Sequence, residues 1–309
     1  MSIIIRHNSG FFSCCSVKLH EIIDYINFHK TIPNHVDSSA QFSWYKRNQQ
    51  EDITYEYFEH YDNILIPSSS ESIINSINYH NVYQFINYSN LDYINIIPIV
   101  KKYFSPSKQI YNIIENIETK YKLDYDNICV LFYRGNDKCT ETSLCNYNEY
   151  VEYANQILKN NPTIVFLIQS DETEFINYIL RVFPKNSFYF KDETRNISKC
   201  KSTVDFLMKN TNYIFSKYYL AITVIMSKCK YIICGSGNCS IWIMFYRGNN
   251  NNVYQNLNGM WLIKEIDNLG RIVNINNNNN QSINVNMGIS NIPITSSRNN
   301  KLSIRMNWR

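Results

Sequence analysis

The sequence places an arginine directly after an apolar run, and a glycine and a charged turn follow it. Arg134 and Gly135 come first, and Asp137, Lys138 and Glu141 come shortly afterwards. An arginine at such a point can present its planar guanidinium group to a phosphate through two parallel hydrogen bonds. The spacing also allows an ion pair between Arg134 and Asp137 that only stabilises the turn. The segment therefore predicts either a phosphate site or a structural ion pair.

Two further apolar runs also end in polar residues. Asp171 and Glu172 follow one run, and the other is followed by Gly235, Ser236, Asn238 and Ser240. Carboxylates at a helix start can serve as caps, which is the alternative interpretation of Asp171 and Glu172. A Gly-Ser-Gly turn before a helix instead exposes backbone N–H groups that can hold a phosphate. Three such ends in one sheet indicate a ligand site more strongly than any one of them.

Other kinds of site are disfavoured by residue placement. All six His residues lie within the first 80 residues, so a histidine-based metal or nucleophile site would have to be built largely from that part of the chain. The nine cysteines form no CxxC pair, so we expect reduced, mostly buried thiols rather than a zinc site or disulfide framework. No metal site and no cofactor are predicted.

The elements that must position these residues follow a regular alternation after about residue 122. Strands are predicted at 128–133, 163–169, 187–190 and 231–234, and helices at 146–158, 172–183, 211–226 and from 239 onward. Repeated strand-helix units predict an α/β fold with a parallel, doubly wound sheet. Ligands bind such sheets beyond the carboxyl ends of the strands, where all three polar segments fall.

The first part of the chain is less regular. It predicts a strand at 2–5, a turn at 8–16, a helix at 17–27, and helical segments near 73–77 and 110–121. The boundary is expected near 122–127, a hairpin turn at Gly270-Arg271, and an Asn-rich, disordered tail after that. The predicted domains are therefore an N-terminal lobe at 1–122, a second lobe at 123–273 and a tail at 274–309.

Composition and charge exclude several partners. Thirty basic and 26 acidic residues give a net charge of only +4 over 309 residues, with no clustered basic stripe for nucleic acid. The longest apolar stretch, 218–226, is too short to span a membrane, and no signal peptide is recognisable, so a cytoplasmic protein is expected. The chain is rich in Asn, Ile and Tyr, as from an AT-rich coding sequence, so single residues of these types carry little information.

These segments together resemble the motifs of the α1,6-fucosyltransferase superfamily, which includes bacterial nodulation enzymes and core N-glycan enzymes. The family signature H-x-R-R-x-D-K, followed by a Glu, is matched by FYRGNDKCTE, which supplies Arg134, Asp137, Lys138 and Glu141. Ser170-Asp171-Glu172 resembles the family's T-D-D, and 232–240 resembles its third motif. The segment 9–14, which contains Gly10 and Ser13, resembles a glycine turn placed over the diphosphate.

The resemblance implies a GT-B architecture, in which two Rossmann-like lobes have parallel sheets facing each other across a cleft. Residues 1–122 would form the acceptor side, and 123–273 would bind the nucleotide sugar. The implied reaction is a metal-independent, inverting transfer of a sugar, from GDP-fucose or a related donor, to a hydroxyl of a glycan or glycoprotein.

The resemblance also implies roles for individual residues. Arg134 would neutralise the β-phosphate with help from Lys138, Asp137 would orient Arg134, and Glu141 would be the base that deprotonates the acceptor. Glu141 lies one position from the family's Glu unless a gap is allowed, so Thr142 and Glu141 both remain candidates. The implied donor-binding residues are Gly10, Ser13, Asp171, Glu172, Gly235, Ser236, Asn238 and Ser240.

Three positions differ from the family pattern. Phe132 replaces its leading His, Gly135 replaces its second Arg, and Ala221 aligns with a base-recognising Asp. These differences support an alternative, a non-catalytic nucleotide-sugar or glycan-binding module derived from such an enzyme. A third alternative is a metal-dependent transferase that uses Asp124 and Asp126, although this pair precedes its strand instead of following it.

Overall fold

The computed structural model describes residues 2–59, 84–266 and 272–273. Three predicted features lie outside the described residues: the helical segment at 73–77, the hairpin turn at Gly270-Arg271 and the Asn-rich tail at 274–309. The fold and the candidate site are built from the described ranges.

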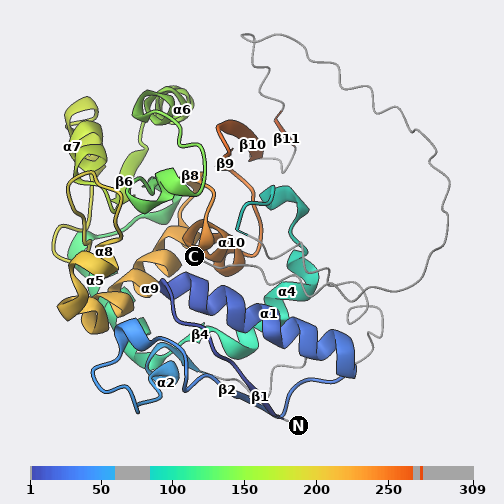
Figure 1. The fold of residues 1–309 in the computed structure, drawn as a ribbon. Coiled ribbons are helices and arrows are strands. Elements are labelled where there is room, and N and C mark those ends of the chain that lie inside the picture. The colour runs from blue at the N-terminus through green and yellow to red at the C-terminus, as the bar shows by residue number, and fades with distance from the viewer. Residues whose placement is uncertain (1, 60–83, 267–271, 274–309) are drawn as a thin grey trace. The chain divides into compact units, whose positions relative to one another are not determined.

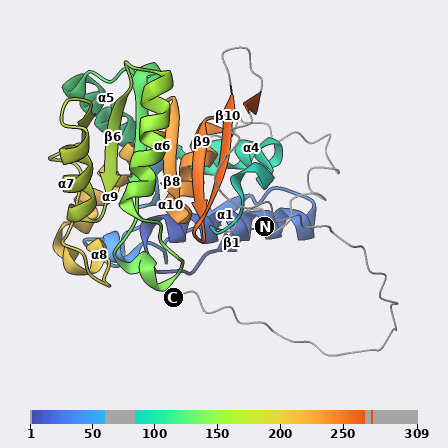
Figure 2. The same cartoon turned by 90° about the horizontal axis from the view of Figure 1, so that it is seen from above.

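The largest sheet has seven strands in the order β11-β10-β9-β8-β5-β6-β7. Strands β7, β6, β5, β8 and β9 are parallel, whereas β10 and β11 continue the sheet in antiparallel pairs. Figure 2 shows β6, β8, β9 and β10 side by side. The bounds are β5 Ile128–Tyr133, β6 Val165–Ser170, β7 Ser187–Phe188, β8 Tyr231–Gly235, β9 Val253–Leu257, β10 Met260–Ile266 and β11 Ile272–Val273. The predicted α/β class with a mostly parallel sheet is confirmed.

Helices cover both faces of this sheet, as seen in Figure 1. Along β5, Val130 and Phe132 join the core formed with helices α5, α9 and α10, while Tyr133 stacks on Phe175 of α7. Every residue of β5 is buried, which explains its continuous apolar sequence. The helix bounds are α5 Lys108–Tyr121, α6 Tyr147–Asn160, α7 Thr173–Val182, α8 Val204–Leu207, α9 Asn212–Lys228 and α10 Asn238–Arg247.

The first part of the chain forms smaller units around helix α1. Strands β1 and β2 pair in parallel, and β3 and β4 pair antiparallel. Residues on both sides of position 122, such as Ile22 and Ile241, belong to one hydrophobic core. The division into lobes at 1–122 and 123–273 stays a prediction. The bounds are β1 Ser2–Ile4, α1 Phe11–His29, β2 His35–Asp37, α2 Thr54–Tyr57, β3 Phe58–Glu59, α4 Tyr93–Tyr103 and β4 Ser105–Pro106.

Helix α1 begins at Phe11, so the expectation of a turn at 8–16 and a helix from residue 17 is wrong. The small polar residues of this segment have low helix propensity, which suggested a turn. However, Phe11, Phe12, Cys14 and Cys15 are all buried, and this packing outweighs local propensity. Ser13 consequently lies inside the first turns of the helix.

A hairpin between β9 and β10 was not predicted. Asn258 and Gly259 have φ values of 51° and 84°, and Leu257 pairs with Met260 across them. Asn-Gly favours this two-residue turn because both of its residues need positive φ. The Asn-rich background concealed the signal.

Two simpler findings concern the cysteines and the helices. All nine cysteines are unpaired, and only Cys139 and Cys200 are not buried. None of the helices among the described residues combines the length and the apolar character needed to cross a membrane.

Lys18 of α1 is a buried amine in the core. Its side chain has no exposed surface, and its Nζ lies 5.4 Å from the ring centroid of Phe104. Burial lowers the pKa of Lys18 from 10.5 to about 8, and the charges of Cys15 and Asp52 only partly oppose this. The protonated amine therefore destabilises the folded chain at neutral pH.

Replacing Lys18→Met should raise the free energy of unfolding at pH 7 by on the order of 3 kcal/mol, since one pKa unit corresponds to about 1.4 kcal/mol. Between about pH 8 and 10.5 the folded lysine releases its proton before the unfolded one does, so the stability of the unchanged chain should rise. Urea denaturation at several pH values measures both effects. The difference between the two chains should shrink above pH 8, and a difference that is constant with pH would contradict the assignment.

Candidate functional site

The sheet brings the three polar strand ends to one edge. Tyr133 pairs with Ser170 across β5 and β6, so Arg134 and Asp171 follow neighbouring positions. On the other side of β5, Phe132 pairs with Cys234, which precedes Gly235. The convergence expected from parallel strands is therefore present.

Arg134 is held by three side chains at this edge. Its Nε donates to Asp171 Oδ2 at 2.9 Å, its Nη2 to Asp137 Oδ1 at 2.9 Å, and its Nη1 to the Tyr219 hydroxyl at 3.2 Å. Burial opposes its charge, but Asp171 leads the interactions that hold the pKa of Arg134 above its usual value. The side chain is 25% exposed. Two of its five N–H groups have no acceptor within the described ranges, so they can donate to a ligand.

Asp171 fixes the turn that follows β5. Its Oδ1 accepts from the Gly135 backbone N–H at 3.1 Å, and its carbonyl accepts from Asn136 Nδ2 at 2.7 Å. The capping interpretation is wrong, because Glu172 is the N-cap residue of α7 and its side chain makes no capping hydrogen bond. Asp171 instead connects the ends of β5 and β6.

The four predicted catalytic residues form a chain of alternating charges. Beyond Arg134, Asp137 Oδ2 lies 3.6 Å from Lys138 Nζ, which donates to both oxygens of Glu141 at 2.7 Å. Burial raises the pKa of Asp137, but Arg134 and Lys138 outweigh it and lower the pKa below its usual value. The ion pair between Arg134 and Asp137 is present, together with the contacts to Asp171 and Tyr219.

Thr142 differs from Glu141 in its surroundings. Its hydroxyl donates to Asn258 Oδ1 in the β9–β10 hairpin at 2.6 Å. This contact directs the hydroxyl toward the hairpin, whereas Glu141 belongs to the charged chain of Arg134. The geometry favours Glu141 over Thr142 as a proton acceptor.

The loop before α10 offers backbone groups and not side chains. Ser236 Oγ donates to the Asn256 carbonyl, Asn238 Oδ1 accepts from Ser16, and Ser240 Oγ donates to the Gly235 carbonyl. These side chains hold the loop in place. The N-cap residue of α10, Gly237, has no side chain to cap the helix, and its first turn contains no acidic residue. Gln84 accepts the first N–H, that of Asn238, which leaves the next N–H groups suited to an anion.

The start of α1 lies close to the same edge. The ring centroid of Phe12 is 5.1 Å from that of Tyr219, whose hydroxyl contacts Arg134. Gly10 is an N-cap without a side-chain capping bond, and a Cβ placed on it would meet no atom within 4 Å. Ser13 Oγ is paired with His7 Nε2 at 2.9 Å. At the start of α1, as at the start of α10, backbone N–H groups and not side chains are available to a ligand.

Glu172 lies beside Gly135 at the edge, but its side chain is not accessible. It has no exposed surface, and neither carboxylate oxygen has a hydrogen-bond partner within the described part of the chain. Lys199 Nζ lies 3.6 Å from it. Burial raises the pKa of Glu172, and Lys199 opposes this only in part. Direct contact of Glu172 with a donor is therefore not supported by its placement.

Sequence reasoning missed two residues that build the site, Tyr219 and Asn136. Asn136 is buried, bonds to the Asp171 carbonyl and accepts from the Cys200 backbone N–H at 2.9 Å. Both are residue types that are abundant in this chain, so composition gave no signal for either. Asn136 lies within the motif of Arg134, which was the one available indication.

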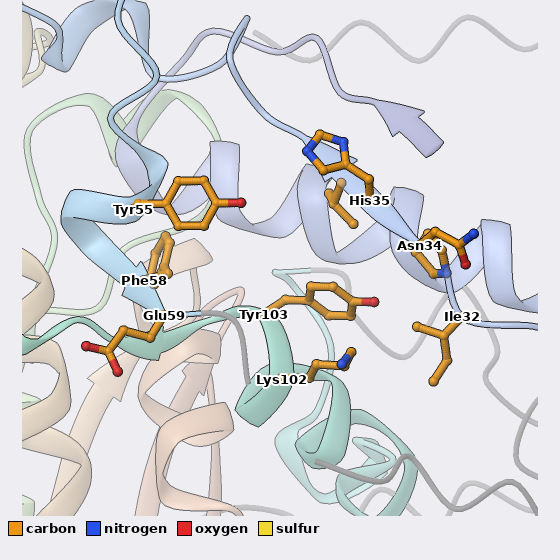
Figure 3. Close-up of a pocket in the computed structure, with 10 residues that line it drawn as sticks. Ile32, Asn34, His35, Tyr55, Phe58, Glu59, Lys102 and Tyr103 are labelled. Atoms are coloured by element: carbon orange, nitrogen blue, oxygen red, sulfur yellow. The ribbon is translucent and has the colours of Figure 1, made fainter. Parts of the chain in front are cut away.

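Two other features lie apart from Arg134. Asp124 and Asp126 precede β5, at the opposite end of that strand, and no group of three potential metal ligands occurs in the described ranges. A pocket of about 830 Å³ lies among N-terminal elements. Figure 3 shows its His35, Tyr55 and Tyr103, which come from β2, α2 and α4. It shares no residue with the predicted site.

Gly135→Ala should destabilise the protein by about 1–3 kcal/mol, because the new Cβ would lie 2.0 Å from Glu172 Oε2 and 2.7 Å from Tyr133 Cε1. Gly237→Ala is the matched control, since its Cβ would meet no atom within 4 Å. Urea denaturation of both variants measures the effect. In a Gly135→Ala and Glu172→Ala double variant, the cost should be smaller than the sum of the single costs. Additive costs would argue against the steric conflict.

Comparisons with known proteins find similar chains among solved structures. No family model matches the sequence, and no curated protein matches it. Among solved structures, NodZ alpha-1,6-fucosyltransferase co-crystallized with GDP is 11% identical with a TM-score of 0.49, over 88% of this chain and 97% of that one. NodZ soaked with GDP-fucose is 9% identical with a TM-score of 0.49, over 79% and 92%. NodZ from Bradyrhizobium is 10% identical with a TM-score of 0.48, over 78% and 91%. Each likeness concerns the fold alone.

Proposed function

We propose that this protein is a glycosyltransferase that moves a sugar from a nucleotide sugar to a hydroxyl group of a glycan or glycoprotein. The observation that carries the proposal is the partly exposed Arg134, held at the carboxyl edge of the sheet with two N–H groups available. The starts of α10 and α1, which carry no acidic residue in their first turns, lie close to it through Tyr219. Such a set of donors suits a diphosphate.

The chemistry follows from where negative charge develops. In the transfer, the bond between the sugar carbon and the β-phosphate oxygen breaks, and the nucleoside diphosphate leaves with the electron pair. Arg134 and the backbone N–H groups of α10 would stabilise the charge that builds on this leaving group. Groups that are already positioned need no reorganisation during the reaction, and one such donor is typically worth about 3–4 kcal/mol.

The acceptor hydroxyl forms the new bond to the sugar and gives its proton to a base. We assign this role to Glu141, which Lys138 holds on the same charged chain as Arg134. Direct displacement of this kind inverts the sugar carbon and needs no metal or cofactor. A two-lobed GT-B arrangement, with the acceptor approaching from the 1–122 side, completes the proposal.

The nucleotide base of the donor is left open. Ala221 is fully buried in α9, and its methyl group can neither donate nor accept a hydrogen bond. Recognition of guanine would need another residue, so GDP-fucose is one candidate among related donors.

A second candidate function is a binding module without catalysis. Two carboxylates already neutralise Arg134, and Lys138 occupies both oxygens of Glu141. A site that only binds a sugar nucleotide would tolerate these pairings, whereas a catalyst must release Glu141 from Lys138 when the acceptor binds. Turnover separates the two functions.

Release of nucleoside diphosphate from a panel of nucleotide sugars, GDP-fucose included, tests the function directly. Arg134→Lys should lower turnover of the accepted donor by about 10²–10³-fold, because lysine cannot replace the guanidinium fork. The exposed Arg181→Ala on α7 is the control that removes an arginine elsewhere. Circular dichroism checks that each variant is folded.

The outcomes distinguish the alternatives. A donor that binds without turnover supports the binding module, and turnover that survives Arg134→Lys removes the assigned site. Turnover that is lost in EDTA and restored by a divalent cation supports the metal-dependent alternative.

Glu141→Gln should lower the rate of transfer by at least about 10²-fold while leaving nucleoside diphosphate affinity unchanged, because the amide cannot accept the proton. Thr142→Val should retain transfer. Initial rates and calorimetric titrations measure the two quantities separately. The reverse pattern, with Thr142→Val inactive and Glu141→Gln active, would transfer the role of base to Thr142.

A further inference from the structure

The start of helix α10 is met by a side chain from a distant segment. The first N–H of the helix, that of Asn238, donates to Gln84 Oε1 at 3.1 Å. Gln84 is 9% exposed and lies 154 positions before Asn238 in the sequence. Gln84 therefore takes one N–H at the positive end of α10, and the next two, those of Cys239 and Ser240, have no side-chain acceptor among the described residues.

The hydrogen bond fixes which way the amide of Gln84 faces. A backbone N–H can only donate, so the carboxamide oxygen must point at Asn238 and the nitrogen must point away. Gln84 Nε2 has no acceptor within the described part of the chain. The Gln84 side chain accepts one backbone N–H of α10 and leaves the two N–H groups of its own Nε2 to donate elsewhere.

Gln255 holds the segment of Gln84 in position. Its Oε1 accepts from the Tyr88 backbone N–H at 2.9 Å, and its Nε2 donates to the Ile86 carbonyl at 2.7 Å and to Ser236 Oγ at 2.8 Å. Gln255 is 2% exposed. One buried side chain therefore ties the segment after Gln84 to the loop before α10.

Arg134 lies near the same helix start. Tyr219 accepts from Arg134 and also interacts with the thiol of Cys239, the second residue of α10. An anion that contacts the guanidinium group is thus close to the first turn of α10. Gln84 approaches this turn from the N-terminal part of the chain, and Arg134 approaches it from the sheet.

We propose that Gln84 is a ligand of the donor's diphosphate, accepting the Asn238 N–H through Oε1 and donating to a phosphate oxygen through Nε2. The identity of the ligand rests on the proposed function, whereas the anion site itself rests on the contacts of Gln84, Gln255 and α10. The part of the chain before residue 122 would then contribute a donor-binding residue that no motif predicts.

A charge change at this position separates binding from a purely structural role. A carboxylate is isosteric with the amide and interacts more favourably with a helix N-terminus. If Gln84 only caps α10, Gln84→Glu should preserve or raise stability and leave anion binding unchanged. If Gln84 binds the diphosphate, the same substitution removes two donors and adds a repelling charge.

Calorimetric titration with inorganic pyrophosphate and with GDP, at one fixed ionic strength, tests the proposal. Gln84→Glu should weaken both affinities by at least about tenfold with an unchanged or higher Tm. Gln50→Glu, at an exposed residue elsewhere, is the control for the change in net charge. Gln84→Ala should weaken pyrophosphate binding less than Gln84→Glu, and it replaces that variant if Gln84→Glu does not fold.

Each result has one meaning. Unchanged pyrophosphate affinity in Gln84→Glu and Gln84→Ala overturns the role of Gln84, and the proposed function survives if Arg134→Lys still loses turnover. If the Gln84 variants lose pyrophosphate affinity and the unchanged chain turns over no donor, the result supports the role of Gln84 and overturns the proposed transferase activity. Absence of binding of either probe to the unchanged chain overturns both.

Discussion

The ion pair between Arg134 and Asp171 joins the ends of two neighbouring strands, and the rest of the site depends on it. Asp171 uses one oxygen for the guanidinium group and the other for the Gly135 backbone N–H, so it sets both the side chain and the turn that carries Asp137, Lys138 and Glu141. Asp171 is nearly buried. Removing one partner of such a pair is costly because the other charge is left without compensation. The pair therefore holds Arg134 in place, and the charged contacts of Asp137, Lys138 and Glu141 continue from it.

The charges at this edge also determine which groups can attract an anion. Arg134 and Lys138 carry two positive charges, and Asp171, Asp137 and Glu141 carry three negative ones, so the chain has a formal sum of −1. A diphosphate would gain little from that sum alone. Backbone N–H groups at the starts of α10 and α1 supply positive potential without counter-charges, because neither first turn contains an acidic residue. In the proposed site the side chains position Arg134, and the helix ends and Gln84 would supply the remaining donors.

Two of the differences between expectation and structure, the start of α1 and the role of Asp171, arise because tertiary packing overrides local preference. Helix α1 includes residues of low helix propensity because its Phe and Cys side chains are buried, with Phe11 packed on Tyr57 of α2 and Phe12 on Trp242 of α10. Asp171 looked like a cap because local sequence shows only the helix that follows it. Its actual partners come from the adjacent strand. The hairpin at Asn258-Gly259 was hidden for a different reason, because Asn is too common in this chain to mark a turn.

Sequence patterns are sufficient to identify the strands β5, β6 and β8 and the polar residues that end them, because a buried parallel strand requires a continuous apolar run. They also indicate Arg134, Asp137, Lys138 and Glu141, which lie close together in the chain and therefore in space. The partners of those residues follow from the packing of the folded chain. Asp171, Tyr219 and Gln84 meet the site from three separate segments, and contacts between distant segments leave no local pattern. Amide and hydroxyl side chains such as Gln84 and Tyr219 acquire a role only through the neighbours that packing gives them.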